Sequence, residues 1–145
     1  MTERERPRRG GADTLSGRVE LRIPNRPEWV AVARLTIAAI ANRLPFSVED
    51  IEDLKLAIAE ACTTVIQSGE GEGTIDIACE TEPGELRIHV RDTRPNRADV
   101  FAERSEASGT EGLGVFLIQA LMDEVRHTVD SETGTELVMI KRVGA

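Results

Sequence analysis

The sequence predicts an α+β sandwich in which a mixed or antiparallel sheet is covered on one face by about three helices. Segments of alternating apolar and polar residues, typical of half-buried strands, occur near the start of the chain, in its middle and at its end. Longer segments between them carry apolar residues at helical spacing. Turns rich in Gly and Pro separate the segments, and the resulting order is β-α-α-β-β-loop-α-β-β.

The composition is typical of a single folded domain. The 145 residues are 40% apolar and 30% charged, which is enough to bury a core without disulfides or metal. The net charge of −8 leaves no basic footprint for nucleic acid, and no apolar run approaches the ~18 residues of a membrane span. Cys62 and Cys79 lie in apolar runs and are expected to be buried thiols. The N-terminus lacks a signal peptide, so a cytoplasmic protein is expected.

The first part of the chain is predicted to contain an arm, a strand and a helix. Residues 1–17 are rich in charge, Gly and Pro, and are expected to form a mobile arm ahead of a domain at 18–145. Residues 18–23 alternate as a strand does. A helix is expected over residues 27 to about 43, with Pro in its first turn and Asn25 as a candidate cap.

The second helix, over residues 50–68, has two faces of opposite character. Ser47 precedes it and is expected to cap its N-terminus, where acidic side chains follow. One face carries an apolar stripe formed by Ile51, Leu54, Ile58, Ala61, Cys62 and Val65. The opposite stripe is formed by Asp53, Ala57, Glu60, Thr64 and Gln67. From the helix alone, this second stripe is either a solvated face or the wall of a polar pocket that contains Glu60 and Thr64.

The middle of the chain is predicted to form a hairpin followed by a long loop. The Gly-rich residues 69–73 end the second helix, and strands at 74–80 and 86–91 pair through a turn. His89 falls on the polar side of its strand, where a surface position is expected rather than a metal site. Residues 93–111 show no clear periodicity, and a connection of this length is typical of a lid over a binding site or of a disordered segment.

Three glycines precede the third helix, whose core face carries Val115, Ile118, Leu121 and Met122. A Gly-rich turn that opens into a helix lets backbone N–H groups approach a phosphate, although glycine also serves turn geometry alone. No Gly-Lys-Ser/Thr follows and no strand directly precedes, so the segment is neither a Walker loop nor a dinucleotide fingerprint. Strands at 125–130 and 135–142 form the final hairpin.

Four elements in this order resemble the sequence boxes of the Bergerat-fold (GHKL) ATPases. They are the acidic Glu60 on a helix, Asp92 at the end of a strand, the glycines Gly109, Gly112 and Gly114, and Gly134-Thr135 at the last strand. Segments 51–63 and 111–126 resemble more closely the RsbW-type anti-sigma factors, which are also serine-protein kinases. The resemblance spans about residues 19–141. It implies the two-layer histidine-kinase-like ATPase sandwich, and it favours the pocket over the solvated face.

The resemblance assigns a role to each matching residue, with ATP and Mg²⁺ as the ligands. Asp92 would accept a hydrogen bond from the adenine amino group, with Thr135 beside it. Glu60 would be the general base that takes the proton from a substrate serine. The phosphates would be held under the 93–111 lid by Gly109, Gly112, Gly114 and the backbone at Leu113.

Two positions depart from the family pattern. The Asn that usually binds Mg²⁺, four residues after the Glu, is Thr64 here, and its hydroxyl has a shorter reach. The Gly expected two residues after Asp92 is Arg94, which would either narrow the adenine pocket or pair with a phosphate.

The family acts by partner switching. Its members sequester a sigma factor, and they phosphorylate a serine of a STAS-type anti-anti-sigma protein, which breaks the competing complex. The resemblance implies this function here, with Arg34 at a partner-contacting position and a homodimer as the expected assembly. The alternative is a module that binds sigma factor without phosphoryl transfer. An ATPase fragment of a histidine kinase or repair ATPase is disfavoured, because no dimerisation or phosphoacceptor helix pair is expected.

Overall fold

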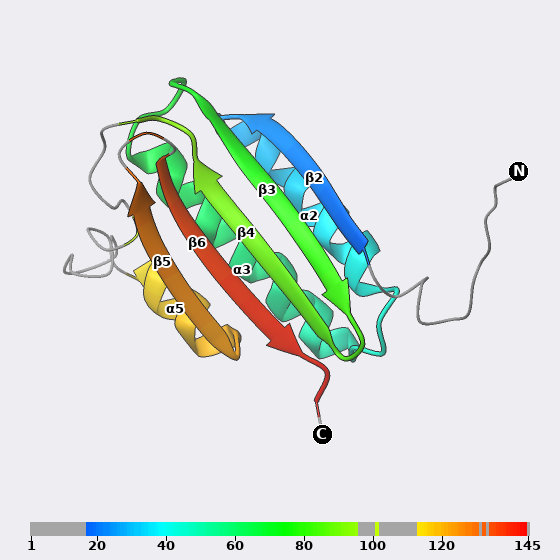
Figure 1. Ribbon diagram of the computed structural model, residues 1–145. Coiled ribbons are helices and arrows are strands. Elements are labelled where there is room, and N and C mark those ends of the chain that lie inside the picture. Colours follow the sequence, from blue (N-terminus) through cyan, green and yellow to red (C-terminus); the bar gives the residue numbers. More distant parts are fainter. Residues whose placement is uncertain (1–16, 96–100, 102–112, 131, 133, 145) are drawn as a thin grey trace, which may run out of the picture.

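The computed structural model of the protein describes residues 17–95, 101, 113–130, 132 and 134–144. Its five strands form one antiparallel sheet in the order β2-β3-β4-β6-β5 (Figure 1). Their bounds are β2 Gly17–Pro24, β3 Thr74–Glu82, β4 Glu85–Asp92, β5 Glu124–Asp130 and β6 Gly134–Arg142. The predicted arm otherwise lies outside the described residues, but Gly17, which was assigned to it, begins β2.

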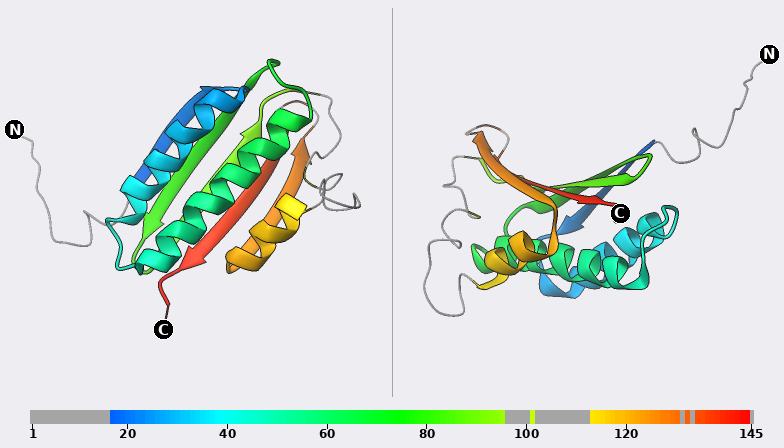
Figure 2. Two further views of the ribbon diagram at one scale, coloured as in Figure 1. Left: turned by 180° about the vertical axis from the view of Figure 1, so that it is seen from behind. Right: turned by 90° about the horizontal axis from the view of Figure 1, so that it is seen from below.

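The helices all pack on one face of the sheet, so that the molecule has two layers (Figure 2). They are the 3₁₀ helix η1 Pro27–Trp29, α2 Val30–Ala41, α3 Val48–Gln67 and α5 Leu113–Leu121. The predicted α+β sandwich is therefore confirmed, with an antiparallel sheet rather than a mixed one. One boundary differs in a way that matters: α5 begins at Leu113, so Gly114 lies in its first turn instead of ahead of it.

The core lies between the two layers. The apolar stripe of α3 is buried there as predicted, with Leu54, Ile58 and Val65 fully inaccessible to solvent. The inward-facing residues of the central strands complete it: Ile75, Ile77, Cys79, Leu86, Ile88, Val90, Leu137 and Met139. The prediction of buried thiols is confirmed, and burial raises the pKa of both Cys62 and Cys79 to about 12. None of the helices in the described ranges is long and apolar enough to cross a membrane.

Two predicted caps have different outcomes. Ser47 accepts a hydrogen bond from the Asp50 N–H at 3.0 Å, and the Asp50 carboxylate accepts one from the Ser47 N–H, so the capping box of α3 is formed. Asn25 is not a cap. Arg26 occupies the N-cap position of η1, and the Asn25 amide instead donates to the carbonyls of Gly69 and Glu72, each at 2.9 Å.

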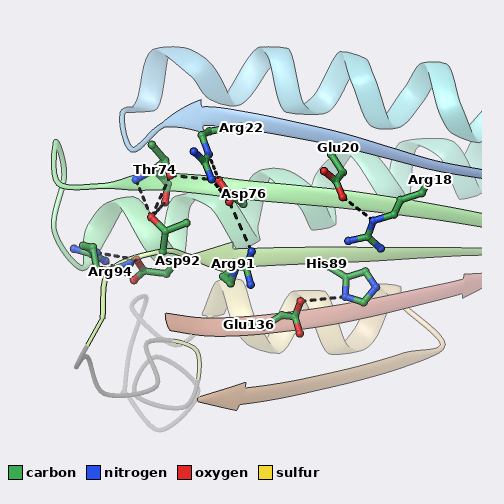
Figure 3. A network of polar contacts seen from close by, with 11 residues as sticks. Arg18, Glu20, Arg22, Thr74, Asp76, His89, Arg91, Asp92, Arg94 and Glu136 are labelled. Atoms are coloured by element: carbon green, nitrogen blue, oxygen red, sulfur yellow. Dashed lines mark hydrogen bonds and ion pairs between the residues drawn. The ribbon is translucent and has the colours of Figure 1, made fainter. Parts of the chain in front are cut away.

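The outer face of the sheet is a ladder of charged side chains (Figure 3). Arg22 makes a bidentate ion pair with Asp76 of the neighbouring strand, at 2.7 and 2.8 Å. His89 lies between Glu80 and Glu136, with its two ring nitrogens 3.0 and 3.2 Å from their carboxylates. His89 is therefore a half-buried surface residue, as its strand pattern predicts.

Candidate functional site

Glu60 and Gly114 lie side by side where α3 packs against α5. A Cβ placed on Gly114 would lie 2.6 Å from Oε1 of Glu60, so only glycine leaves this carboxylate in its present position. Within the polar stripe of α3, Ala57 and Thr64 are buried, Asp53 and Glu60 are half-buried, and Gln67 is exposed. The middle of the stripe is thus not a solvated face, and the carboxylate of Glu60 lies beside the N-terminal turn of α5.

Thr64 lies one turn after Glu60 on the same face of α3. Its side chain is 4% exposed, and its hydroxyl donates to the Glu60 carbonyl at 2.9 Å. This bond uses the only hydroxyl proton and leaves the oxygen lone pairs as acceptors. Thr64 can therefore offer an oxygen to a cation without losing its bond to the helix.

Asp92 and Thr135 form a second buried polar group, at the end of β4. They are direct partners in the β4–β6 register, and neither is exposed to solvent. Gly134, at φ +99°, allows this pairing because a Cβ there would lie 1.8 Å from the Asp92 carbonyl oxygen. The predicted grouping of Asp92 with Gly134-Thr135 is therefore built into the sheet.

Arg94 binds the Asp92 carboxylate directly (Figure 3). Its Nε donates to Oδ1 at 2.8 Å and its Nη2 to Oδ2 at 2.6 Å, and the Arg94 backbone N–H adds a bond to Oδ1 at 3.1 Å. The side chain of Arg94 is only 8% exposed. Hydrogen bonding to Asp92 raises the pKa of Arg94, so the guanidinium stays charged. The Arg94 side chain thus lies directly against the carboxylate of Asp92, in a position that would narrow an adenine pocket there.

The same guanidinium joins the end of β4 to the end of α3. Arg94 Nη2 donates to Oγ of Ser68 at 2.6 Å, and Nη1 donates to the carbonyl of Gly69 at 3.3 Å. Ser68 follows Glu60 by eight residues, which corresponds to about 12 Å along a helix. The Glu60 and Arg94 side chains therefore lie at different levels along α3, and the side of α3 between Glu60 and Ser68 is called the region beside α3 below.

Asn25, which the sequence suggested only as a cap, anchors the turn next to this region. Besides its two amide bonds to the turn, its backbone carbonyl accepts from the Gly71 N–H at 2.8 Å. Its partners lie 44 and 47 residues away in the chain, so no local sequence pattern reveals them. The Gly-rich residues 69–73 are thus held between Asn25 and Arg94.

Other candidate residues are only partly described. Gly109, Gly112 and most of the 93–111 lid lie outside the described residues, and of its later part only Phe101 is described, buried in the core. Leu113 is exposed at the start of α5. Arg34 is exposed and lines a groove of about 670 Å³ between α2 and α3.

The donor set matches a cation that arrives with phosphate better than a self-contained metal centre. Within the described ranges, no three His, Cys, Asp or Glu side chains are grouped to hold a metal ion. Mg²⁺ commonly uses one or two protein oxygens and completes its shell with water and substrate phosphates. Thr64 provides one such oxygen, one helical turn after Glu60.

Comparison with known proteins finds a matching family and similar sequences. Residues 23–141 match the family described as the histidine kinase-like ATPase domain. The chain is similar to the serine-protein kinase RsbW of Listeria innocua, with 34% identity over 143 residues, or 90% of this chain and 90% of that protein. It is 38% identical over 134 residues to RsbW of Halalkalibacterium halodurans, which covers 85% of this chain and 82% of that protein.

A solved structure shares the fold. The SiaB–SiaC complex from Pseudomonas aeruginosa contains a chain that superposes with a TM-score of 0.61 at 11% identity. The match covers 84% of this chain and 88% of that chain. At this level of identity the likeness shows the architecture alone.

Proposed function

Because the chain belongs to the histidine kinase-like ATPase domain family, and within it to the RsbW-type serine-protein kinases, we propose that it is an ATP-binding anti-sigma factor. In this proposal it sequesters a sigma factor and phosphorylates a serine of a STAS-type anti-anti-sigma protein. The observation that carries the proposal is the contact between Glu60 and Gly114, which puts a carboxylate beside the N-terminal turn of a helix.

Glu60 is the proposed general base. It accepts the proton of the substrate serine hydroxyl while the serine oxygen bonds to the γ-phosphorus and the bond from that phosphorus to the ADP oxygen breaks. Bound ATP supplies the phosphoryl group, and Mg²⁺ would be held with the Thr64 hydroxyl as a protein ligand. The N–H groups at Leu113 and Gly114 favour negative charge at the start of α5.

The other end of the region is the proposed binding site for the adenine base of ATP. Asp92 is the acceptor for the adenine amino group, and Thr135 lies opposite it in the register. When Asp92 binds a nucleobase in place of the Arg94 side chain, it discriminates strongly against one without an amino donor, because an unpaired buried polar group is costly.

Partner binding is proposed for the groove that Arg34 lines. The STAS protein and the sigma factor would compete for this side of the helical layer, and a phosphate on the STAS serine adds roughly two negative charges that oppose its return. A homodimer is part of the proposal, and light scattering of the purified chain checks it.

Nucleotide binding is tested first, by isothermal titration of ATP with and without Mg²⁺. We expect saturable binding that Mg²⁺ strengthens and that Asp92→Asn weakens. The absence of ATP binding to the wild-type chain at millimolar concentration, with the fold intact by circular dichroism, would overturn the proposal.

Phosphoryl transfer is tested with radiolabelled ATP and a STAS-domain protein from the same genome. Glu60→Gln should retain ATP binding and lose serine phosphorylation. The matched control is Glu52→Gln, because Glu52 is on the same helix in an exposed pair with Lys55. Equal transfer by wild type and Glu60→Gln would remove Glu60 from the role of base.

The second candidate is a partner-switch module without phosphoryl transfer. Two observations favour it: Thr64 replaces the family's Mg²⁺ ligand, and Arg94 already occupies Asp92. A kinase limited by its metal site should gain activity from Thr64→Asn. This alternative would be established if the wild-type chain binds sigma factor and ATP, and if neither it nor the Thr64→Asn variant transfers phosphate.

A further inference from the structure

At the proposed adenine-binding end of the region, Asp92 already accepts hydrogen bonds from Arg94. Both carboxylate oxygens of Asp92 accept from Arg94, and the bidentate geometry is the strongest that an arginine and a carboxylate form. An exocyclic amino group that is to bind Asp92 would use the same oxygens. Since Asp92 is completely buried, the base cannot approach it while the Arg94 side chain keeps this position.

Every guanidinium nitrogen of Arg94 has a protein partner. Nε binds Asp92, Nη2 binds Asp92 and Ser68, and Nη1 binds the Gly69 carbonyl and lies 3.6 Å from Glu72. A guanidinium has five N–H donors: four make these hydrogen bonds, and the nitrogen that carries the fifth is in the ion pair with Glu72. In this arrangement every nitrogen of the Arg94 guanidinium is engaged by protein groups.

The Gly-rich turn is shaped around the Arg94 side chain. A Cβ on Gly69 would lie 2.0 Å from Nη1, and a Cβ on Gly73 would lie 2.9 Å from Cγ of the same arginine. Glycine at these two positions therefore makes room for the extended side chain. The Arg94 side chain is therefore held by close packing against Gly69 and Gly73 as well as by its ion pair with Asp92.

We propose that Arg94 is an internal competitor for the nucleobase at Asp92. The inference rests on the proposed ATP-binding function and adds a residue that sets the affinity and base selectivity of that site. Adenine binds Asp92 only in molecules in which the Arg94 guanidinium has moved away from Asp92. The measured affinity for ATP is therefore the affinity of this open state multiplied by the fraction of molecules that adopt it.

The competition makes a specific chemical prediction about base identity. Replacement of the Arg94 side chain leaves the buried carboxylate with only the backbone N–H of residue 94 as a donor, and the adenine amino group then takes the place of the guanidinium. Inosine triphosphate carries an oxo group in place of that amino group, so its 6-substituent accepts hydrogen bonds and cannot donate one to Asp92. Loss of the Arg94 side chain should therefore strengthen the binding of ATP much more than the binding of inosine triphosphate.

The test compares dissociation constants of ATP and inosine triphosphate for the full chain and three variants. Arg94→Gly, the residue that the family pattern has here, should bind ATP about tenfold or more tightly, which is about 1.4 kcal/mol. Ser68→Ala removes one contact of Arg94 while leaving Asp92 untouched, and should strengthen ATP by a smaller factor. The matched control is Arg22→Gly, which removes a bidentate Arg–Asp pair from the outer face of the same sheet and should leave both constants unchanged.

The outcomes separate the inference from the function on which it rests. Equal ATP affinity of wild type and Arg94→Gly would overturn the inference and leave the proposed function standing. An equal gain for both nucleotides would also overturn it, because competition for Asp92 requires the amino group. If no variant binds ATP, the proposed function fails. Thermal unfolding shows whether Arg94→Gly is folded, and if it is not, the ATP affinity of Ser68→Ala decides.

Discussion

The position of the Glu60 carboxylate depends on the absence of a side chain at Gly114. Gly114 lies in the first turn of α5, where alanine is a better helix former than glycine by up to about 1 kcal/mol. Gly114→Ala should therefore preserve or slightly raise the free energy of unfolding. The new Cβ would displace Oε1 of Glu60. Misplacing a catalytic group in this way can lower the rate of phosphoryl transfer about 100-fold.

The measurement for this residue is kcat for serine phosphorylation at saturating ATP, with the melting temperature measured in parallel. Gly144→Ala is the control, because a Cβ there meets nothing within 4 Å. A Gly114→Ala protein with wild-type kcat would show that the position of the Glu60 carboxylate does not matter for transfer.

Single residues also show where sequence reasoning succeeds. Glu60 and Thr64 could be assigned to one face because helical spacing is arithmetic, and Asp92 could be placed because a strand ends there. Arg94 departs from the family pattern in a way that the sequence shows, but the sequence does not decide between its two alternatives. The choice between them depends on Ser68 and Gly69, which are 26 and 25 residues away in the sequence.

At the scale of elements, α3 organises the site. Its N-terminus is fixed by the capping box at Ser47, its middle carries Glu60, and its C-terminal end meets Arg94 through Ser68. The periodicity and cap of this helix were readable from sequence because both are local. The way the following turn is anchored was not readable, since its anchor is Asn25 at the end of a distant strand.

The turn anchor yields a stability prediction. Asn25→Ala removes two hydrogen bonds from a residue that is 1% exposed and leaves the Glu72 carbonyl without the amide donor. The free energy of unfolding should fall by about 2–3 kcal/mol, measured by urea denaturation. Asn42→Ala is the control: its amide makes one bond, to Ala38 at an exposed helix end, and its loss should cost less than about 1 kcal/mol. An equal effect of the two changes would contradict the anchoring role.

At the scale of the whole molecule, the two layers protect both thiols. The pKa of Cys62 and of Cys79 is about 12 in the folded chain, because burial disfavours the thiolate. Neither thiol should react with iodoacetamide at pH 8 in the native protein, and both should react in denaturant. Rapid labelling of the native chain, followed by mass spectrometry, would contradict this core.

The same shift predicts how stability depends on high pH. The folded pKa lies above the ordinary value of 9.0, so the contribution of the two thiols is complete below pH 9 and is lost as the pH rises toward 12.

The fold class itself was predictable from periodicity. The antiparallel β4–β6 pairing was not, because residues 93–133, with α5 and β5 among them, separate those two strands in the chain.

The central claim is that Asp92 and the start of α5 belong to one nucleotide site that runs along α3. A crystal structure of the full chain with ADP and Mg²⁺ measures this most directly. We predict the adenine amino nitrogen within about 3.2 Å of the Asp92 carboxylate, and the phosphates at the N-terminal turn of α5 beside Glu60. Nucleotide bound in the groove between α2 and α3, or with its base away from Asp92, would contradict the account.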